Sequence, residues 1–136
     1  LKNIISTFGN SSRWIVNHDR KGRNWFPNDE NNLTQLRTLF KKRNIPNSFR
    51  GALIFTKDDF LKFCKDLMSY PYAVFDEGDL LYMDLDISND QLPFILKISG
   101  HLNIDLLSTN KEFLRKIVNE NRSNKFIVKE YRGTSF

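Results

Sequence analysis

The sequence predicts an α+β fold, an antiparallel sheet of about five to six strands with about three helices packed on it. Short apolar runs follow one another closely between residues 80 and 107, and neighbouring runs of this kind pair as antiparallel strands. Apolar residues recur at helical spacing in 32–42, 57–70 and 110–118. A chain of 136 residues has room for one hydrophobic core, so we expect a single domain over 1–136.

The first half is predicted to alternate strands with helices. Residues 13–16 are typical of a short strand, and residues 32–42 place their leucines and Phe40 on one helical face. Pro46 then breaks the chain, and residues 51–55 have the composition of a short buried strand.

A capping box predicts the start of the second helix. Thr56 is followed three residues later by Asp59, and we expect Pro71 to end the helix. The apolar stripe between them includes Cys64, which we interpret as a small core residue. The full stripe is Phe60, Phe63, Cys64, Leu67 and Met68.

The second half is predicted to be mostly sheet. The apolar runs 72–75 and 80–83, joined by the polar residues 76–79, indicate a β-hairpin. Beyond them, Leu85 and Ile87 alternate with Asp84 and Asp86, so the two carboxylates should share one face of a strand.

Two further strands, a helix and a closing strand are expected after this alternation. The strands are 93–99 and 102–107, which lie on either side of Gly100. Thr109 with Glu112 forms a second capping box, which predicts the start of the last helix. The alternation at 126–128 predicts the closing strand.

The charges of the chain are segregated along its length. Residues 1–50 carry ten Lys and Arg against three Asp and Glu, whereas residues 51–110 carry four against ten. The net charge of the whole chain is +5, so the acidic middle stands out against a basic background. Such a separation steers charged partners. The acidic candidates for partner binding are Asp76, Glu77, Asp79, Asp84, Asp86 and Asp90.

The sequence also contains residues that two kinds of enzyme could use, a metal-dependent enzyme and a ribonuclease. Asp84 and Asp86 have the oxygen ligands that Mg²⁺ or Mn²⁺ prefers, and His101 is the only nearby candidate for the third ligand that such a site needs. Because this spacing of carboxylates is common by chance, we expect no metal and no cofactor. His18 and His101 could act as the base and the acid of a small ribonuclease or toxin domain, with Lys97 or Arg20 stabilising the phosphorane. A small ribonuclease or toxin domain therefore remains an alternative to a binding protein.

A second alternative is direct binding of nucleic acid. The basic segments 20–23 and 41–43, with Trp14, Trp25 and Phe26 close to the first, are typical of a surface that pairs phosphates and stacks bases. The acidic middle of the chain opposes this, because it repels phosphates.

The segment 92–108, between an acidic hairpin and a capped helix, resembles the compact α+β immunity proteins of bacterial polymorphic and contact-dependent toxin systems. The resemblance covers the second half of the chain and lies in size and element order. It implies a non-enzymatic antitoxin in bacterial competition, which binds a cognate protein toxin and covers its active site. The net charge of +5 leaves open an acidic partner that binds residues 1–50, whereas the acidic stretch favours a basic nuclease. Carboxylates that mimic phosphates would serve that purpose.

We expect the protein to be cytoplasmic and not bound to a membrane. The chain begins without a basic-then-apolar signal pattern, and its apolar runs are far shorter than the ~20 residues that span a bilayer. Cys64 is the single cysteine, so the chain cannot form an internal disulfide.

Overall fold

The computed structural model describes residues 2–6, 8–19, 22–75, 78, 80, 83–101 and 103–122. Within these residues it confirms the α+β class, a five-stranded antiparallel sheet with four helices. The elements in chain order are α1 (Lys2–Ser6), β1 (Arg13–His18), α2 (Thr34–Lys42), β2 (Leu53–Thr56), α3 (Lys57–Ala73), β3 (Leu85–Asn89), β4 (Phe94–Ile98), β5 (Ile104–Ser108) and α4 (Lys111–Glu120).

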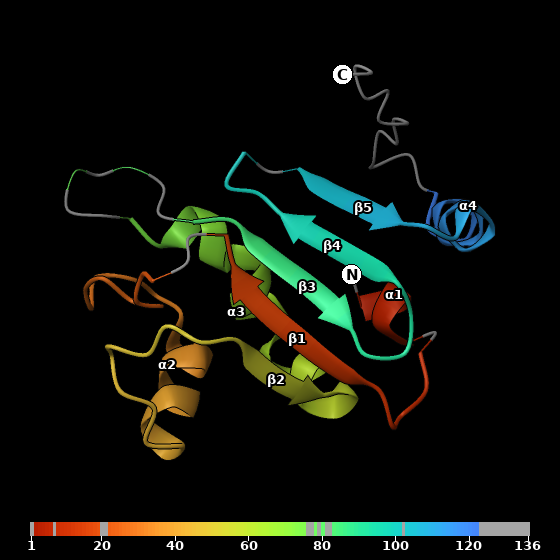
Figure 1. Cartoon of the computed structure of the whole chain (residues 1–136). Coiled ribbons are helices and arrows are strands. Elements are labelled where there is room, and N and C mark those ends of the chain that lie inside the picture. Colours follow the sequence, from red (N-terminus) through yellow and green to blue (C-terminus); the bar gives the residue numbers. More distant parts are fainter. Residues whose placement is uncertain are drawn as a thin grey trace.

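The sheet has the strand order β2-β1-β3-β4-β5, and every neighbouring pair is antiparallel (Figure 1). β1 therefore lies between β2 and β3 in the sheet, although both of these strands are far from it in the sequence. From β3 onward the strands follow the chain order as a meander, as the sequence predicts for this region.

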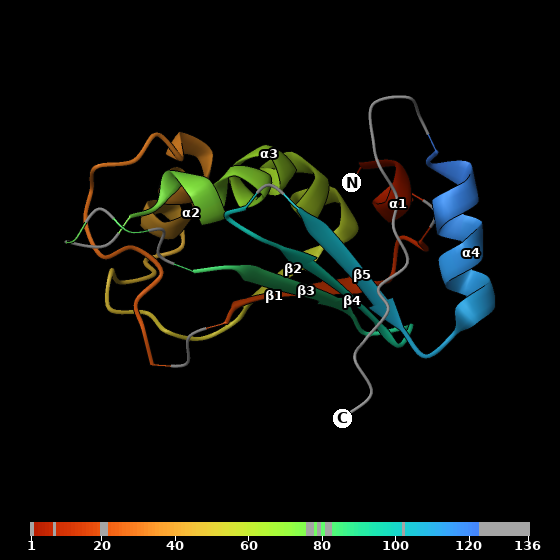
Figure 2. The same ribbon diagram turned by 90° about the horizontal axis from the view of Figure 1, so that it is seen from above.

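The described helices lie on one side of the sheet (Figure 2). α3 packs across the middle strands, α2 packs against α3, and α4 lies beside the end of β5. The alternation of the strands explains the arrangement, because every second side chain of β1, β3 and β4 is buried towards α3. The core between the two layers includes Trp14, Val16, Phe60, Leu67, Leu85, Ile87 and Leu96.

The start of α3 is as predicted, but its end is not. Thr56 Oγ1 accepts a hydrogen bond from the backbone N–H of Asp59 at 3.2 Å, which confirms the cap. The helix then continues through Pro71 to Ala73. Pro71 has no N–H to donate to the carbonyl four residues before it, so the helix lacks one backbone hydrogen bond there. The helix continues because Tyr70, Pro71 and Val74 are buried against the core.

The predicted hairpin over 72–83 is wrong in its first arm. Tyr72 and Ala73 belong to α3, because Tyr70 and Val74 are buried one helical turn apart while Tyr72 is 41% exposed. Residues 76, 77, 79, 81 and 82 lie outside the described residues. The strand that carries the alternation begins at Leu85, and Leu85 and Ile87 face the core as expected.

Four smaller points concern α4, β2, α1 and the predicted closing strand. The cap of α4 is Asn110 and not Thr109, because the Asn110 side chain accepts the N–H of Phe113 at 3.0 Å. The strand predicted at 51–55 is the edge strand β2, so one of its side chains, Ile54, is exposed. The short helix α1 was not predicted, and the predicted strand 126–128 lies outside the described residues.

Loss of the Asn110 cap should destabilise the protein more than loss of the neighbouring hydroxyl. Asn110→Ala removes an acceptor for an otherwise unpaired helix N–H and should lower the free energy of unfolding by about 1 kcal/mol. Thr109→Ala, the matched control, should change it by less than about 0.5 kcal/mol. Urea unfolding of both variants checks this, and the reverse order of effects would return the cap to Thr109.

Phe60→Ala should be strongly destabilising. The Phe60 ring is fully buried and contacts Trp14 and Phe55, with ring centroids 5.2 and 6.0 Å away. Truncating it leaves a cavity between α3 and the sheet, at a cost of about 3–5 kcal/mol in the free energy of unfolding. Lys65→Ala on the exposed side of α3 serves as the control. Equal losses in the two variants would remove Phe60 from the core.

Candidate functional site

The sheet face opposite α3, called here the open face, carries a row of apolar side chains. Registered pairs place five residues side by side across all five strands, namely Ile54, Ile15, Ser88, Ile95 and Leu107. The exposed fractions of Ile54, Ile95 and Leu107 are 64%, 45% and 52%. None of the described helices lies on this face (Figure 2). Apart from Ser88 the row is apolar, and exposed apolar side chains gathered in this way are typical of a protein-binding site.

A charged row runs beside the apolar row on the same face. In register across four strands it consists of Asn17, Asp86, Lys97 and Asp105. Asp86 lies directly opposite Lys97 on one side, and Asp105 lies opposite Lys97 on the other. This row therefore carries two carboxylates and one ammonium group.

Two further carboxylates adjoin Lys97 at the end of β3. The Lys97 Nζ atom lies 3.5 Å from Asp84 Oδ2 and 4.0 Å from Asp19 Oδ2. The backbone N–H of Asp84 donates to Asp19 Oδ1, and the N–H of Gly100 donates to Asp84 Oδ1. Among the described residues, one ammonium group is thus shared by three carboxylates, which gives this cluster a net negative charge.

Asp86 is the member of this cluster whose ionisation is disfavoured. Burial raises the pKa of its carboxyl above the ordinary value of 3.8. The Lys97 ammonium opposes that rise, while the Asp19 and Asp84 carboxylates add to it.

Asp90 lies at the other end of β3 and belongs to a different contact. Its carboxylate accepts hydrogen bonds from the backbone N–H and from Nε of Arg13, at 2.8 and 3.0 Å. These bonds hold the pKa of the Asp90 carboxyl below its ordinary value. Six residues separate it from Asp84, roughly 20 Å along a strand. Its charge is therefore balanced locally.

Of the six predicted acidic residues, the structure brings together Asp84 and Asp86. Asp76, Glu77 and Asp79 lie outside the described residues. The cluster also contains Asp19, which the sequence analysis missed because it lies 65 residues away from Asp84. The pairing of β1 with β3 creates that proximity.

The two histidines occupy different environments. His18 ends β1 on the core side of the sheet, is 3% exposed and packs edge-on against Trp25. His101 is exposed in the turn between β4 and β5. A pair of catalytic imidazoles must both reach one substrate phosphate. The burial of His18 does not fit that requirement.

The aromatic residues proposed for base stacking are part of the core. Trp14, Trp25 and Phe26 are 1%, 0% and 4% exposed, so their faces are already used in packing. Cys64 is also buried, as predicted, and burial raises the pKa of its thiol. The exposed cations at the end of α2, residues 41–43, keep their place on the surface.

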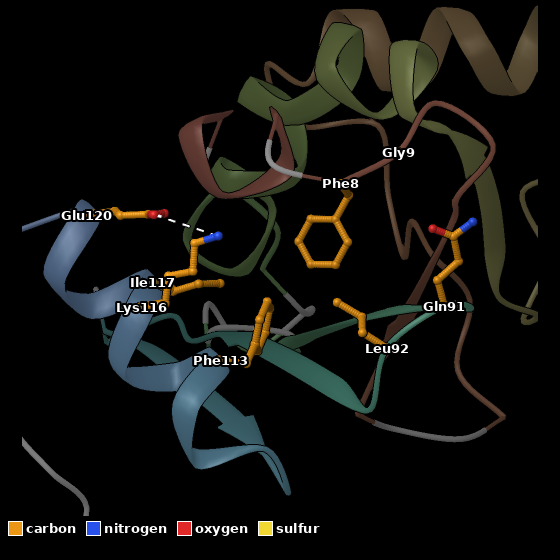
Figure 3. Close-up of a pocket in the computed structure, with 8 residues that line it drawn as sticks. All are labelled: Phe8, Gly9, Gln91, Leu92, Phe113, Lys116, Ile117 and Glu120. Atoms are coloured by element: carbon orange, nitrogen blue, oxygen red, sulfur yellow. Dashed lines mark ion pairs between the residues drawn. The ribbon is translucent and has the colours of Figure 1, made fainter.

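A cavity of about 340 Å³ lies between α4, the segment before β1 and the turn after β3 (Figure 3). Its wall is largely apolar, and at its rim Lys116 pairs with Glu120 at 3.9 Å. The lining residues are Phe8, Gly9, Gln91, Leu92, Phe113, Lys116, Ile117 and Glu120. This set lacks a nucleophile paired with a base, so the open face is the stronger candidate site.

Among the described residues, no group of three or more His, Cys, Asp or Glu side chains is arranged to hold a metal ion. The described helices include none that is long and apolar enough to cross a membrane. Comparison of the chain with protein-family models, with curated proteins and with solved structures gave no match.

Asp86→Asn should stabilise the protein at neutral pH. The raised pKa means that the folded state prefers the protonated carboxyl, so stability is full below pH 3.8 and declines as the pH rises through the folded pKa. An uncharged amide avoids that decline. Urea unfolding should show a gain in the free energy of unfolding at pH 7 that disappears at pH 3.

Asp90→Asn, one residue beyond the end of β3, should change the free energy of unfolding in the opposite direction. The lowered pKa of Asp90 gives stability that is present above pH 3.8 and is lost as the pH falls through the folded pKa. The variant should therefore be less stable than the wild type at pH 7, with a difference that shrinks towards pH 2. The same sign for both variants at pH 7 would contradict the two environments described here.

Proposed function

We propose that this protein is a non-enzymatic inhibitor of a protein toxin, of the immunity type, and that it binds the toxin through the open face. The observation that carries the proposal is the pairing of an exposed apolar row with a net negative row on the side of the sheet that none of the described helices covers. Protein interfaces commonly combine an apolar centre with a charged border.

The charge of the open face favours a basic partner. Asp19, Asp84, Asp86 and Asp105 surround the single ammonium of Lys97, whereas the basic residues of α2 lie on the helical side of the sheet. A partner with a cationic cleft, such as a nuclease domain, would be attracted to this face and held in one register. Covering the cleft would exclude the nucleic-acid substrate.

The direct nucleic-acid alternative rests on one observation, the exposed run Lys41, Lys42 and Arg43 at the end of α2. Phosphates would bind there by charge alone, because the neighbouring tryptophans are buried. The same charge reversal on the open face distinguishes the two functions.

The double variant Asp84→Lys with Asp86→Lys should abolish toxin neutralisation. It places two cations against a cationic cleft, which opposes binding by several kcal/mol. Because Asp84 also accepts the N–H of Gly100 and pairs with Lys97, circular dichroism must show that the variant keeps its fold. The partner is first obtained as the polypeptide that co-purifies with the tagged chain from its source cells. Survival of cells that express this partner then reports neutralisation, and the association rate should fall steeply with salt.

Glu30→Lys with Glu120→Lys is the matched control. Both residues are exposed and lie away from the open face, and the control changes the net charge of the chain by the same amount. It should protect cells as the wild type does. Full protection by the open-face variant, together with tighter binding of single-stranded RNA and no lost protein partner, would overturn the inhibitor proposal and favour the nucleic-acid alternative.

A further inference from the structure

Among the described residues, no strand pairs with the outer edge of β5. β5 is an edge strand of the sheet and pairs with β4 alone among the described strands (Figure 1). The N–H of Ser99 donates to the carbonyl of Asn103, so these two residues form a hydrogen-bonded pair of the ladder. Antiparallel ladders alternate, which makes Asp105 and Leu107 the next residues that bond to β4.

The alternation assigns the other residues of β5 to the outside. The backbone N–H and C=O groups of Ile104, Leu106 and Ser108 point away from β4, on the side where the structure describes no further strand. The strand contains no proline and no lysine or arginine, which commonly protect a sheet edge against pairing. Two of its apolar side chains, Ile104 and Leu107, are 45% and 52% exposed. The edge is therefore suited to accept a further strand.

The side chains beside this edge indicate the chemistry of that strand. Leu107 ends the apolar row of the open face, and Asp105 ends the charged row. An added strand would extend both rows if it placed an apolar residue beside Leu107 and a cation beside Asp105. Lys97 already neutralises part of the charge inside the sheet, but Asp105 has no cation on its outer side among the described strands.

A second copy of this chain fits the edge less well. Two β5 strands that pair antiparallel about Leu106 would bring Asp105 of each copy to diagonal positions on the same face. Like charges at such positions oppose pairing. Charge complementarity therefore favours a cationic strand from a different protein.

We propose that β5 binds an extended segment of the protein partner as a sixth strand, with a lysine or arginine beside Asp105 and an apolar residue beside Leu107. This mode of recognition takes its affinity from main-chain hydrogen bonds and its specificity from alternate side chains. It rests on the proposed function only for the identity of the partner as a toxin. The chemistry of the edge can be tested without that partner.

The probe is the capped peptide Thr-Val-Val-Lys-Val, which pairs antiparallel with β5 from Ser108 to Ile104. Amide hydrogen exchange, measured by NMR at millimolar peptide, should slow at Ile104, Leu106 and Ser108 by up to the factor 1 + [L]/Kd. The amides of Asp105 and Leu107 already bond to β4 and serve as internal controls. The same peptide with glutamate in place of lysine should bind at least about tenfold more weakly.

Two variants separate the backbone from the charge. Ile104→Pro removes an outward N–H without removing a bond to β4, so it should abolish peptide protection, whereas Ile104→Thr should retain it. Asp105→Lys leaves the backbone intact and should reverse the preference between the lysine and glutamate peptides. If the proline variant does not fold, the Asp105→Lys variant still tests whether β5 prefers a cationic strand.

The outcomes distinguish this inference from the proposed function. Unchanged exchange at all three outward amides, or protection that is independent of the charge at residue 105, would overturn the cationic strand. Slow exchange without peptide, together with a dimer in sedimentation, would show that a second copy occupies the edge. If Ile104→Pro still neutralises the toxin but the Asp84 and Asp86 reversal does not, the sixth strand fails and the open-face inhibitor stands.

Discussion

The packing of α3 on one side of β1, β3 and β4 is the interaction on which the rest of the structure depends. Period-two alternation divides these strands into a buried set, which includes Val16, Ile87 and Leu96, and an outward set. The buried set forms one row across the sheet under α3. Since the described helices use only this side, the outward set is left as a continuous surface.

The register of the strands arranges the outward side chains in an apolar row and a charged row. A shift of one residue between β3 and β4 would move Asp86 and Lys97 out of alignment and would place side chains of the buried set in solvent. The core therefore fixes the order of the open face. Its apolar and charged rows are aligned because Ile87, Leu96 and Leu106 are aligned beneath them.

The sequence was sufficient for local patterns and insufficient for long-range pairing. The alternation at Leu85 and Ile87 and the cap at Thr56 were predicted, because both depend on residues only a few positions apart. The end of α3 was misjudged because Pro71 is a strong stop signal in sequence, yet Tyr70 and Val74 pack on the helical face around it. Asp19 was missed because only the pairing of β1 with β3 brings it to Asp84.

The same distinction applies to the candidate site. The acidic stretch was visible in the sequence, but the structure divides its described members between a cluster around Lys97 and the Arg13–Asp90 ion pair. The aromatic residues near the first basic segment looked available for stacking, whereas Trp14 and Trp25 are core residues. Local composition does not predict whether a side chain is buried when the residues that pack over it are distant in the sequence.

Isoleucine methyl NMR of the protein with its co-purified partner tests the central claim most directly. Ile15, Ile54 and Ile95 report the open face, and Ile5 and Ile117, which are buried on the helical side, are controls in the same spectrum. The account predicts that binding shifts or broadens the methyl signals of the first three residues and leaves those of Ile5 and Ile117 unchanged. Changes confined to the helical side, with the open-face signals unmoved, would contradict it.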